Sequence, residues 1–268
     1  MPALKSGKVC IFGAGGPVGA AAAVSLKGHY TLRLTDLRPI ADIQREGKPQ
    51  SPGAPLPVAL GAPHECRAVD VTDYAQVLGA AQGMDALINV TVVRPHPVQA
   101  FRVNLLGAYN VAKAAVACGI RRIIHTGPLH THLNHEADYW HDFDIPDDVP
   151  LHPGTDLYAL TKHLGGHVTR AFAERAGLEV LTFLYCNFRP GDGGSAPDGV
   201  GAHCFTTSWE DTGEAFRYGL QAADMPRPYE VFFICAPMPH GKYSPAKAER
   251  LLGWKAQHTL ERLYRKKA

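Results

Sequence analysis

A tyrosine and a lysine four positions apart, Tyr158 and Lys162, are the side chains of this sequence best suited to proton transfer. Residues four apart share one face of a helix, and the surrounding stretch DLYALTKHLGG favours a helix over about 156–176. The lysine ammonium would lower the pKa of the phenol, so that the tyrosine could act as a general base or acid near neutral pH. The same spacing also occurs as a surface pair without chemistry, so other features must decide between the two interpretations.

A glycine-rich stretch near the N-terminus, FGAGGPVGAAAA, places Gly13, Gly16 and Gly19 between an expected strand and an expected helix. Glycines there allow a tight turn and let the backbone approach a pyrophosphate at the helix N-terminus. Asp36 ends the next expected strand, where its carboxylate would bind the adenosine ribose and repel a 2′-phosphate. The pattern predicts a dinucleotide site that favours NAD over NADP, although Arg38 lies two residues further on. The alternative is a glycine-rich turn that binds no nucleotide.

A cluster of histidines follows the fifth expected strand. Three of them have the spacing H-x-H-x-x-H with two aspartates nearby, a set that could provide ligands for zinc or another metal that prefers imidazole. They fall on an expected loop without helical spacing, so we predict the rim of a substrate pocket rather than a metal site. The histidine within the strand is expected to be a core residue whose hydrogen bonds are satisfied. These residues are His125 in the strand, then His130, His132 and His135, with Asp138 and Asp142.

Short apolar strands alternate with helices through most of the chain, which predicts an α/β fold with a parallel, doubly wound sheet. After residue 185 the alternation gives way to Gly- and Pro-rich loops, one helix, one strand and a helical C-terminal piece. We predict one domain over 1–268, with a dinucleotide-binding core over about 1–185 and a mostly substrate-binding annex over about 186–268. The strands are expected at 8–12, 30–34, 67–69, 87–90, 122–125, 180–185 and 229–235, and the longer helices over about 98–118, 156–176 and 211–223.

The composition excludes several classes of protein. With 46% hydrophobic and 19% charged residues, the 268-residue chain can bury a globular core. A net charge of +2 indicates no nucleic-acid surface, and the basic run at Arg262 and 265–267 is typical of a solvated tail. The six cysteines form no C-x-x-C pair, which indicates reduced thiols. No stretch is long and apolar enough for a membrane span, and the first residues contain no signal peptide, so we expect a cytoplasmic protein.

Taken together, the motifs resemble the short-chain dehydrogenase/reductase superfamily, and more narrowly its extended, NAD-dependent epimerase/dehydratase branch. Within the branch, the short length and the stretch FTTSWEDTGEAFRYGLQAA at 205–223 look most like bacterial uronate dehydrogenases, which oxidise an aldohexuronic acid at C1 to a lactone. The resemblance implies a Rossmann-type doubly wound parallel sheet with a small C-terminal substrate-binding annex. It rests on the glycines at 13–19, Asp36, Asp70-Val71, Asn89, VNLLGAYNVAKAA at 103–115, Tyr158 with Lys162, and SPAKAERLLGW at 244–254.

The resemblance implies a set of contacts to NAD. The backbone of the glycine turn would cradle the pyrophosphate, and residues after the second and third strands would contact the adenosine ribose and the adenine. Residues after the fourth strand would pass beneath the nicotinamide, and those after the sixth strand would line it. The implied cofactor residues are Gly13, Gly16, Pro17, Val18, Gly19, Asp36, Leu37, Asp70, Val71, Asn89, Val90, Thr91, Tyr158, Lys162, Tyr185 and Asn187.

Catalytic roles follow from the same resemblance. Tyr158 would take the hydroxyl proton while a hydride leaves the same carbon for NAD, and Lys162 would tune Tyr158 and hold the nicotinamide ribose. Asn104 falls where the family keeps a helix asparagine that supports the active-site geometry. His130 matches a histidine that uronate dehydrogenases carry beside the substrate, and Thr131 follows it.

One departure from the family concerns catalysis. The family ends its fifth strand in two small hydroxyl residues, of which the second is the catalytic serine, whereas this chain has Gly127 and Pro128. Neither side chain can donate a hydrogen bond, and losing such a donor costs ~10²–10³ in rate in enzymes where it has been tested. Thr126, His130 and Thr131 are the candidate substitutes.

A second departure concerns the substrate. The arginine expected to bind a uronate carboxylate falls at Leu184, so Arg94 and Arg189 are the candidate cations. With either of them in that role a sugar acid is expected, and otherwise a neutral sugar or another secondary alcohol.

We therefore predict an NAD-dependent oxidoreductase that oxidises a hydroxyl of a sugar or sugar acid. The alternatives are an epimerase or dehydratase that retains its NAD, which the short annex disfavours, and a non-catalytic dinucleotide-binding sensor, which would not need Tyr158 and Lys162. Gly165-Gly166 within a long helix requires close packing, either across a dimer interface of the helices 98–118 and 156–176 or within one subunit. We expect a homodimer with a small-molecule substrate and no nucleic acid, membrane or metal.

Overall fold

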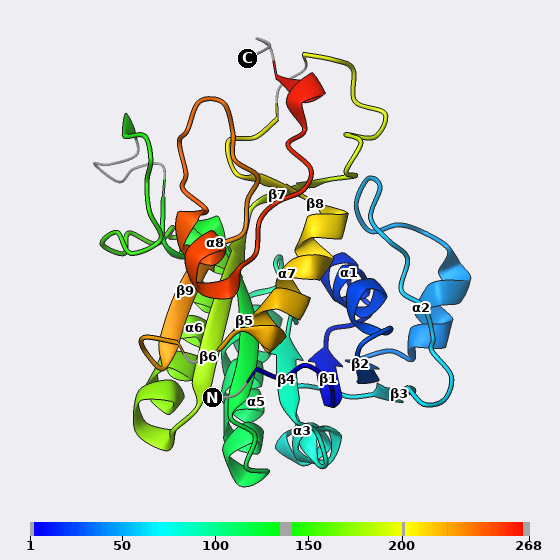
Figure 1. Cartoon of the computed structure of the whole chain (residues 1–268). Coiled ribbons are helices and arrows are strands. Elements are labelled where there is room, and N and C mark those ends of the chain that lie inside the picture. The colour runs from blue at the N-terminus through cyan, green and yellow to red at the C-terminus, as the bar shows by residue number, and fades with distance from the viewer. Residues whose placement is uncertain (1–2, 135–140, 200–201, 224, 265–268) are drawn as a thin grey trace.

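The computed structural model describes residues 3–134, 141–199, 202–223 and 225–264 (Figure 1). Seven strands form the main sheet in the order β3-β2-β1-β4-β5-β6-β9, and all neighbouring strands run parallel. The strand order reverses between β1 and β4, which confirms the expected doubly wound sheet and creates a crevice at its carboxyl edge. The strands are β1 (Lys8–Phe12), β2 (Thr31–Asp36), β3 (Glu65–Ala68), β4 (Ala86–Asn89), β5 (Arg122–Pro128), β6 (Glu179–Tyr185) and β9 (Tyr229–Phe233).

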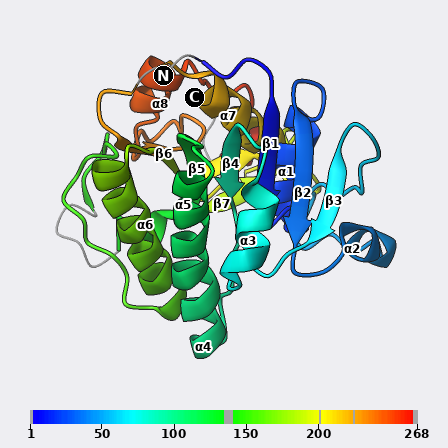
Figure 2. The ribbon, with the colours of Figure 1, turned by 90° about the horizontal axis from the view of Figure 1, so that it is seen from below.

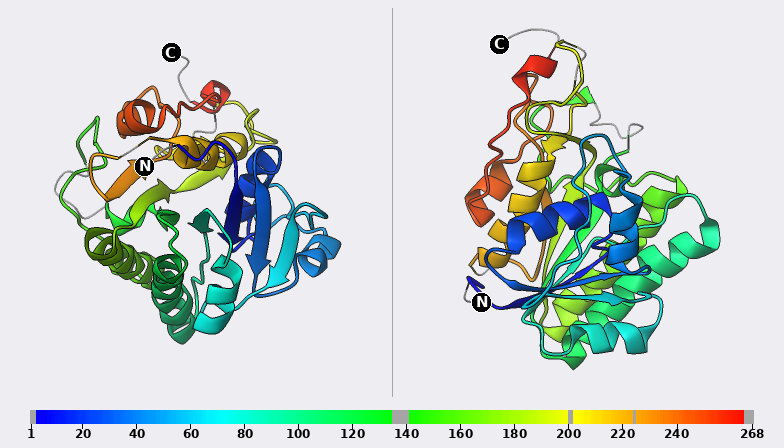
Figure 3. Two further views of the ribbon diagram at one scale, coloured as in Figure 1. Left: turned by 60° about the horizontal axis from the view of Figure 1, so that its bottom comes forward. Right: turned by 90° about the vertical axis from the view of Figure 1, so that its right-hand side faces the viewer.

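Helices cover both faces of this sheet (Figure 2; Figure 3, left). One face carries α3 (Tyr74–Ala81), α5 (Gly107–Ala117) and α6 (Leu157–Ala176), which pack on one another in that order. The other face carries α1 (Pro17–Leu26) and α7 (Trp209–Gln221). The short helices α2 (Ile40–Glu46) and α8 (Ala246–Leu252) lie beside the two edges, next to β2 and β3 and next to β9.

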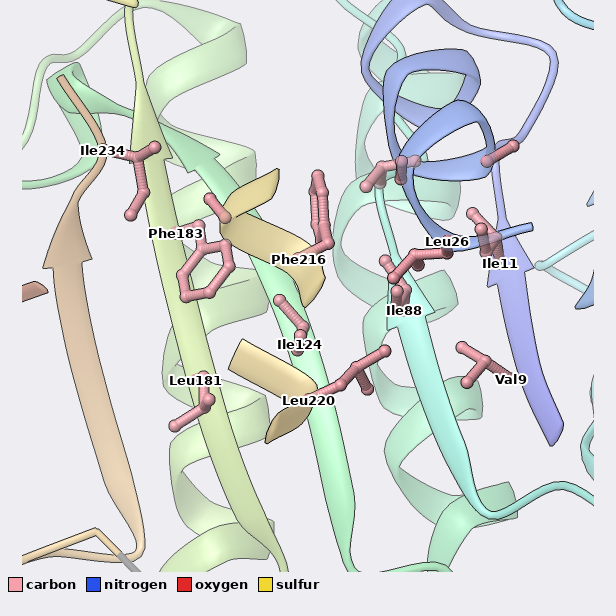
Figure 4. Close-up of a cluster of buried hydrophobic side chains, with 14 of the residues drawn as sticks. Val9, Ile11, Leu26, Ile88, Ile124, Leu181, Phe183, Phe216, Leu220 and Ile234 are labelled. Carbon is pink, nitrogen blue, oxygen red and sulfur yellow. The ribbon is translucent and has the colours of Figure 1, made fainter. Parts of the chain in front are cut away.

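The first strand shows how the two layers are filled. Val9 and Ile11 join the buried cluster beneath α1 and α7, together with Phe183 (Figure 4), whereas Cys10 and Phe12 join the cluster beneath α3 and α5. Strands that are apolar on both faces are typical of a parallel sheet covered by helices on each side. This packing fixes the positions of the strand ends, from which the candidate site is built.

The segment after β6 belongs partly to the core and partly to the upper end of the molecule. β9 pairs with β6, and α7 packs against α1, so both are elements of the main fold. The small sheet of β7 (Asn187–Arg189) and β8 (Thr206–Ser208) lies above the carboxyl ends of the strands with η4 (Glu261–Leu263) (Figure 1; Figure 3, right). An edge strand and a covering helix of the main fold therefore come from the segment after residue 185, and the division into a core and a mostly substrate-binding annex stays a prediction.

The helix expected over 98–118 is interrupted. α4 (Pro97–Ala100) runs into a π-helical turn, η1 (Phe101–Leu106), before α5 begins. Such turns are rare and occur frequently at functional sites. A Cβ atom at Gly165 of α6 would lie only 2.3 Å from the carbonyl oxygen of Asn104 in η1. Gly165 therefore lets α6 pack on η1 within one subunit, which is one of the two explanations considered for the glycine pair.

Several apolar side chains of α4, η1, α5 and α6 are exposed on the outer surface, among them Val98, Phe101, Tyr109 and Leu160. They would be available to a second subunit, and the homodimer stays a prediction. Among the described residues, no helix has both the length and the apolar character that a bilayer crossing requires.

Gly165→Ala should destabilise the fold by up to about 2 kcal/mol, because overpacking against a backbone atom costs ~1–3 kcal/mol and the gain in helix propensity returns only ~1 kcal/mol. Gly79 in α3 offers a matched control, since a Cβ atom there would meet nothing within 4 Å. Gly79→Ala should therefore be neutral or stabilising. Urea unfolding of both variants measures the difference, and equal effects would contradict the packing explanation.

Candidate active site

The glycine turn lies between the end of β1 and the start of α1. Gly13 has φ +91°, which favours glycine, and a Cβ atom there would lie 3.0 Å from the backbone nitrogen of Thr91. A Cβ atom at Gly19 would lie 2.4 Å from the Gly13 carbonyl oxygen, so Gly19 allows α1 to sit directly against the turn. With Gly16 as N-cap and Pro17 as the first helical residue, the N-terminus of α1 faces the crevice end of the sheet. The turn has the shape that a dinucleotide pyrophosphate requires.

Asp36 ends β2 beside this turn. Its Oδ2 accepts a hydrogen bond from the Gly15 amide at 3.0 Å. Burial raises the pKa of the Asp36 carboxyl above its ordinary value, and backbone N–H groups, that of Gly15 first, oppose the rise. Leu37 is exposed, and Arg38 is held in an ion pair with Glu46 of α2. The position expected to contact the adenosine ribose thus offers a carboxylate, with the nearby arginine already paired.

Asp36→Ser should shift the cofactor preference from NAD toward NADP. A hydrogen bond to a charged group contributes ~1.5–3 kcal/mol, so NAD affinity should fall about 10- to 100-fold, while a 2′-phosphate would no longer be repelled. Fluorescence titration with NADH and NADPH measures both affinities. Asp42→Ser, on the neighbouring helix α2, should leave both unchanged, and an unaltered NADH:NADPH ratio in Asp36→Ser would refute the assignment.

A cavity of about 670 Å³ opens at the carboxyl ends of β4, β5 and β6. We call it the front cavity. Its wall brings together residues that lie far apart in the sequence and that were predicted for cofactor binding, catalysis and substrate binding. These wall residues are Val18, Val90, Arg94, Thr126, His130, Tyr158, Lys162 and Tyr185.

The first turns of α6 place Tyr158 and Lys162 in this wall. Asp156 caps the helix by accepting hydrogen bonds from the amides of Tyr158 at 3.1 Å and Ala159 at 3.0 Å. Lys162 is 3% exposed, and its Nζ donates to the Thr91 carbonyl at 3.3 Å. Burial, followed by the charge of Arg94, lowers the pKa of Lys162 to about 7. This amine therefore exchanges its proton near neutral pH.

The side chain of Arg94 lies over the ring of Tyr158, with Cζ 4.9 Å from the ring centroid. Burial raises the pKa of the Tyr158 phenol, and the Arg94 guanidinium opposes that rise. No carboxylate in the described part of the chain forms an ion pair with Arg94. The front cavity thus contains, next to the phenol, a positive charge that has no ion-pair partner within the described ranges.

Asn104 in η1 connects the loop that carries Arg94 to α6. Its side-chain nitrogen donates to the Val93 carbonyl at 2.7 Å and to the Thr161 hydroxyl at 2.9 Å, and its oxygen accepts from the Val93 amide at 3.0 Å. Asn104 is 1% exposed and lies outside the front-cavity wall. It therefore contacts the neighbours of Arg94 and Lys162 in the sequence, Val93 and Thr161, and its support of the active-site geometry stays a prediction.

The match to a known family decides what these features belong to. Residues 9–198 match the model of the NAD-dependent epimerase/dehydratase family. The chain belongs to this family. The expectations of a family enzyme and of NAD as its cofactor are thereby confirmed.

Individual family members show how similar the chain is to characterised proteins. It is 26% identical over 216 residues to the uronate dehydrogenase of Pseudomonas putida, which covers 80% of this chain and 71% of that protein. It is 26% identical over 186 residues to the L-arabinose 1-dehydrogenase (NAD(P)(+)) of Haloferax volcanii, which covers 65% of this chain and 64% of that protein. The structure of uronate dehydrogenase from Agrobacterium tumefaciens matches with a TM-score of 0.71 at 21% identity, and the match covers 96% of this chain and 86% of that one. The structural match confirms the Rossmann-type fold.

The candidate substitutes for the family serine occupy different places. Thr126 lines the front cavity, and its hydroxyl donates to the Asn89 carbonyl at 3.2 Å. His130 also lines it. Thr131 was predicted to contact substrate, but it is 4% exposed, donates to the Pro128 carbonyl at 2.8 Å and lines a different cavity. The structure therefore brings Thr126 and His130 to the site of this family member and leaves Thr131 outside it.

The two candidate cations are also separated. Arg189 in β7 donates to the Phe188 carbonyl at 2.9 Å and does not line the front cavity, so Arg94 is the cation at the site. Asn187, predicted near the nicotinamide, lies outside the same wall, and its side-chain oxygen accepts from the Thr206 hydroxyl at 3.4 Å. Successive side chains of a strand point to opposite faces, so Phe188 of β7 lines the front cavity whereas Asn187 and Arg189 on either side of it do not.

The remaining predicted cofactor residues lie at strand ends along the carboxyl edge. Asp70 and Val71 follow β3, where the Val71 carbonyl accepts a hydrogen bond from the Asn110 side chain at 2.9 Å. Asn89 ends β4, and its side-chain oxygen accepts from the Thr91 hydroxyl at 2.7 Å. These bonds hold the loops after β3 and β4 in place, and their contacts to NAD stay predictions.

No three His, Cys, Asp or Glu side chains in the described ranges are grouped as metal ligands. The turn η2 (Leu129–Thr131) that follows β5 separates the histidines, since His130 lines the front cavity and His132 lines another. His125 is 1% exposed and so is buried as expected, but neither of its ring nitrogens has a hydrogen-bond partner among the described residues. His135 and Asp138 lie outside the described residues, so the absence of a metal stays a prediction.

Several wall residues were not indicated by any motif. The loop before α6 contributes Gly154, Thr155 and Asp156, whereas Cys186 and Phe188 belong to the segment after β6 that was expected to line the nicotinamide. A signal for the loop was present in the sequence, because an aspartate two residues before Tyr158 is a preferred N-cap and fixes the start of the helix.

Proposed function

We propose that this protein is an NAD-dependent dehydrogenase that oxidises a hydroxyl group of a sugar or sugar acid, with Tyr158 as the general base. The observation that carries the proposal is the convergence of Tyr158, Lys162 and Arg94 on one cavity beside the glycine turn. A protein that only binds a dinucleotide would need the turn and Asp36 but no proton acceptor in the crevice.

In the proposed reaction, the Tyr158 phenolate accepts the proton of the substrate hydroxyl. NAD, when bound at the turn, serves as the acceptor of the hydride from the same carbon. The Arg94 guanidinium over the Tyr158 ring and the nearby Lys162 amine stabilise the phenolate, which burial alone would disfavour. His130, and the lone pairs of the Thr126 hydroxyl, are placed to bind the substrate oxygens from the β5 side.

The charge of Arg94 supports a sugar acid as substrate. The similar protein of P. putida is named for a uronate and that of H. volcanii for L-arabinose, so the relatives include a sugar acid and a neutral sugar. A guanidinium without an acidic partner in a cavity favours a ligand that brings a carboxylate. We therefore place sugar acids before neutral sugars.

The test is purified protein with NAD and a panel of uronic acids, aldoses and polyols, followed by NADH absorbance. Turnover on uronic acids supports the full proposal, and turnover on neutral sugars alone would remove Arg94 from substrate recognition. NAD that stays bound through purification, with no net NADH from any substrate, would favour an epimerase or dehydratase instead.

Arg94→Gln should lower kcat/KM for uronic acids about 10- to 100-fold more than for neutral sugars, because a charge-assisted hydrogen bond contributes ~1.5–3 kcal/mol. Both classes should also lose some rate, since Arg94 helps to stabilise the Tyr158 phenolate. Arg189→Gln is the matched control, because Arg189 lies outside the front cavity and should leave the ratio unchanged. An equal loss for acids and neutral sugars would assign Arg94 to Tyr158 alone.

A further inference from the structure

A second cavity, of about 360 Å³, lies between α6, β5, β6 and β9. We call it the histidine cavity, because His125, His132, His163 and His167 line it. One end is formed by residues that are almost fully buried, including His125 and Lys162, and the mouth is formed by exposed residues such as Arg170 and Glu174. The cavity therefore reaches from the surface to the core beside the catalytic helix.

The histidine cavity and the front cavity share part of their walls. Lys162 and Gly127 line both of them. Gly127 stands where the family has a small hydroxyl residue, and a Cβ atom there would lie 3.2 Å from Leu184 Cδ2 and 3.4 Å from Thr131 Cγ2. At this position the wall between the two cavities therefore has no side chain.

Most charged side chains around the histidine cavity are neutralised in pairs. Lys247 bridges Asp147 at 3.3 Å and Glu230 at 2.8 Å, and Glu230 also pairs with Arg227 at 2.9 Å. At the mouth, Arg170 pairs with Glu174 at 2.7 Å, beside the exposed Asp148. These ion pairs connect the carboxylates and cations with one another, and imidazole rings make up much of the remaining polar lining between them and Lys162.

Burial favours the uncharged form of three of these histidines, His125, His132 and His167. Burial lowers the pKa of His125 well below its ordinary value and that of His132 to about 4, and burial followed by His163 lowers the pKa of His167. For His125, the charge of Lys162 adds to the effect. Neutral rings do not repel a proton that leaves Lys162, and they offer it acceptors along the way.

Hydrogen-bonding groups lead outward through the cavity. Both ring nitrogens of His125 have no hydrogen-bond partner among the described residues, and polar groups of this kind are usually satisfied by water. Further out, His163 Nδ1 donates to the Thr131 carbonyl at 2.9 Å, and His163 Nε2 lies 3.0 Å from Nε2 of the exposed His167. The series runs from a buried to a half-buried to an exposed imidazole.

We propose that the histidine cavity is a rear proton exit, through which water receives the substrate proton from Lys162 and releases it past His163 and His167. The inference rests on the proposed dehydrogenase reaction. Each oxidation breaks one C–H and one O–H bond, so one hydride goes to NAD and one proton must reach the solvent. Tyr158 takes that proton and Lys162 receives it, while substrate and cofactor fill the front cavity. The rear cavity lets the proton leave without their release.

Access to Lys162 can be measured without any substrate. Cyanate, a small reagent that carbamylates neutral amines, is applied in the presence of saturating NADH, and Lys162 modification is followed by peptide mass spectrometry. Gly166 lines the histidine cavity, and a Cβ atom at this position would lie 3.4 Å from its nearest neighbour, Tyr229 Oη. A larger side chain therefore fits there, and Gly166→Leu fills the cavity. It should slow carbamylation roughly tenfold, since the reagent must then await local opening. Gly79→Leu, in open space on α3, should not change it.

Proton release is measured in stopped flow with a pH indicator on a substrate found by the panel. In the wild type, NADH and the released proton should appear together, whereas in Gly166→Leu the proton should lag behind NADH. His163→Phe, which keeps the ring but removes both nitrogens, should show the same lag and be relieved by added imidazole. It also serves as the second variant if Gly166→Leu does not fold.

The outcomes separate the two proposals. Unchanged carbamylation in Gly166→Leu, or simultaneous NADH and proton release in both variants, would overturn the rear exit while leaving the dehydrogenase intact. Failure of every substrate in the panel would instead count against the dehydrogenase, and the cyanate comparison would still decide whether Lys162 is reached from the rear.

Discussion

Tyr158→Phe should lower turnover by about 10³-fold on the best substrate of the panel, within the range of 10²–10⁴ typical of a lost general base. The phenylalanine keeps the ring beneath the Arg94 guanidinium but has no oxygen to accept the substrate proton. NAD binding should change little, because Asp36 and the glycine turn lie elsewhere in the crevice. Steady-state kinetics and NADH fluorescence titration measure the two effects separately.

A matched control for this variant is Tyr109→Phe on α5, an exposed tyrosine far from the front cavity wall, which should keep full activity. If Tyr158→Phe kept the turnover of the wild type, the general base would have to be another group of the wall, and His130 would be the first to examine. If it lost NAD binding as well, the change would be structural rather than catalytic.

The elements that depend on local pattern could be predicted from the sequence. The apolar run KVCIF, the glycine turn and the Tyr158 helix appear where expected, because strand alternation, glycine spacing and helix capping are set by neighbouring residues. The strand expected at 229–235 forms over 229–233, but its place at the edge of the main sheet was not expected, since a pairing partner distant in the sequence leaves no local signal.

Which residues line the site depended on three-dimensional contacts that the spacing of residues in the sequence does not reveal. His130 and His132 are two residues apart but line different cavities, because the η2 turn directs them to opposite sides. Arg94 and Arg189 were equivalent as candidates until the fold placed only Arg94 beside Tyr158. The π-helical turn that aligns Asn104 with Thr161 was likewise invisible, because it arises from packing against α6.

Lys162→Met should abolish most activity and at the same time stabilise the fold, a combination that a purely structural residue would not show. Lys162 is almost fully buried, and its pKa of about 7 in the folded protein lies below its ordinary value of 10.5. Between these two values the unfolded chain binds more protons than the folded one, so the stability of the wild type rises with pH over this window. Methionine has a similar length and no charge to desolvate, at the loss of one hydrogen bond to the Thr91 carbonyl.

The advantage of Lys162→Met over the wild type should therefore be greatest at and below about pH 7, of the order of a few kcal/mol, and should shrink toward pH 10. Thermal or urea unfolding across this range measures it, with Lys113→Met, an exposed lysine of α5, as the control that should show no such trend. Activity should fall by ~10²-fold or more, because the phenolate loses a neighbouring amine and the substrate proton loses its next acceptor. If Lys162→Met were less stable than the wild type at pH 7, the wild-type amine would have to be well solvated. Neither its proton exchange with Tyr158 in the front cavity nor its proton release into the histidine cavity would then follow from its burial. Gain of stability with loss of turnover would instead show that the fold tolerates the cost of this buried amine because the reaction requires it.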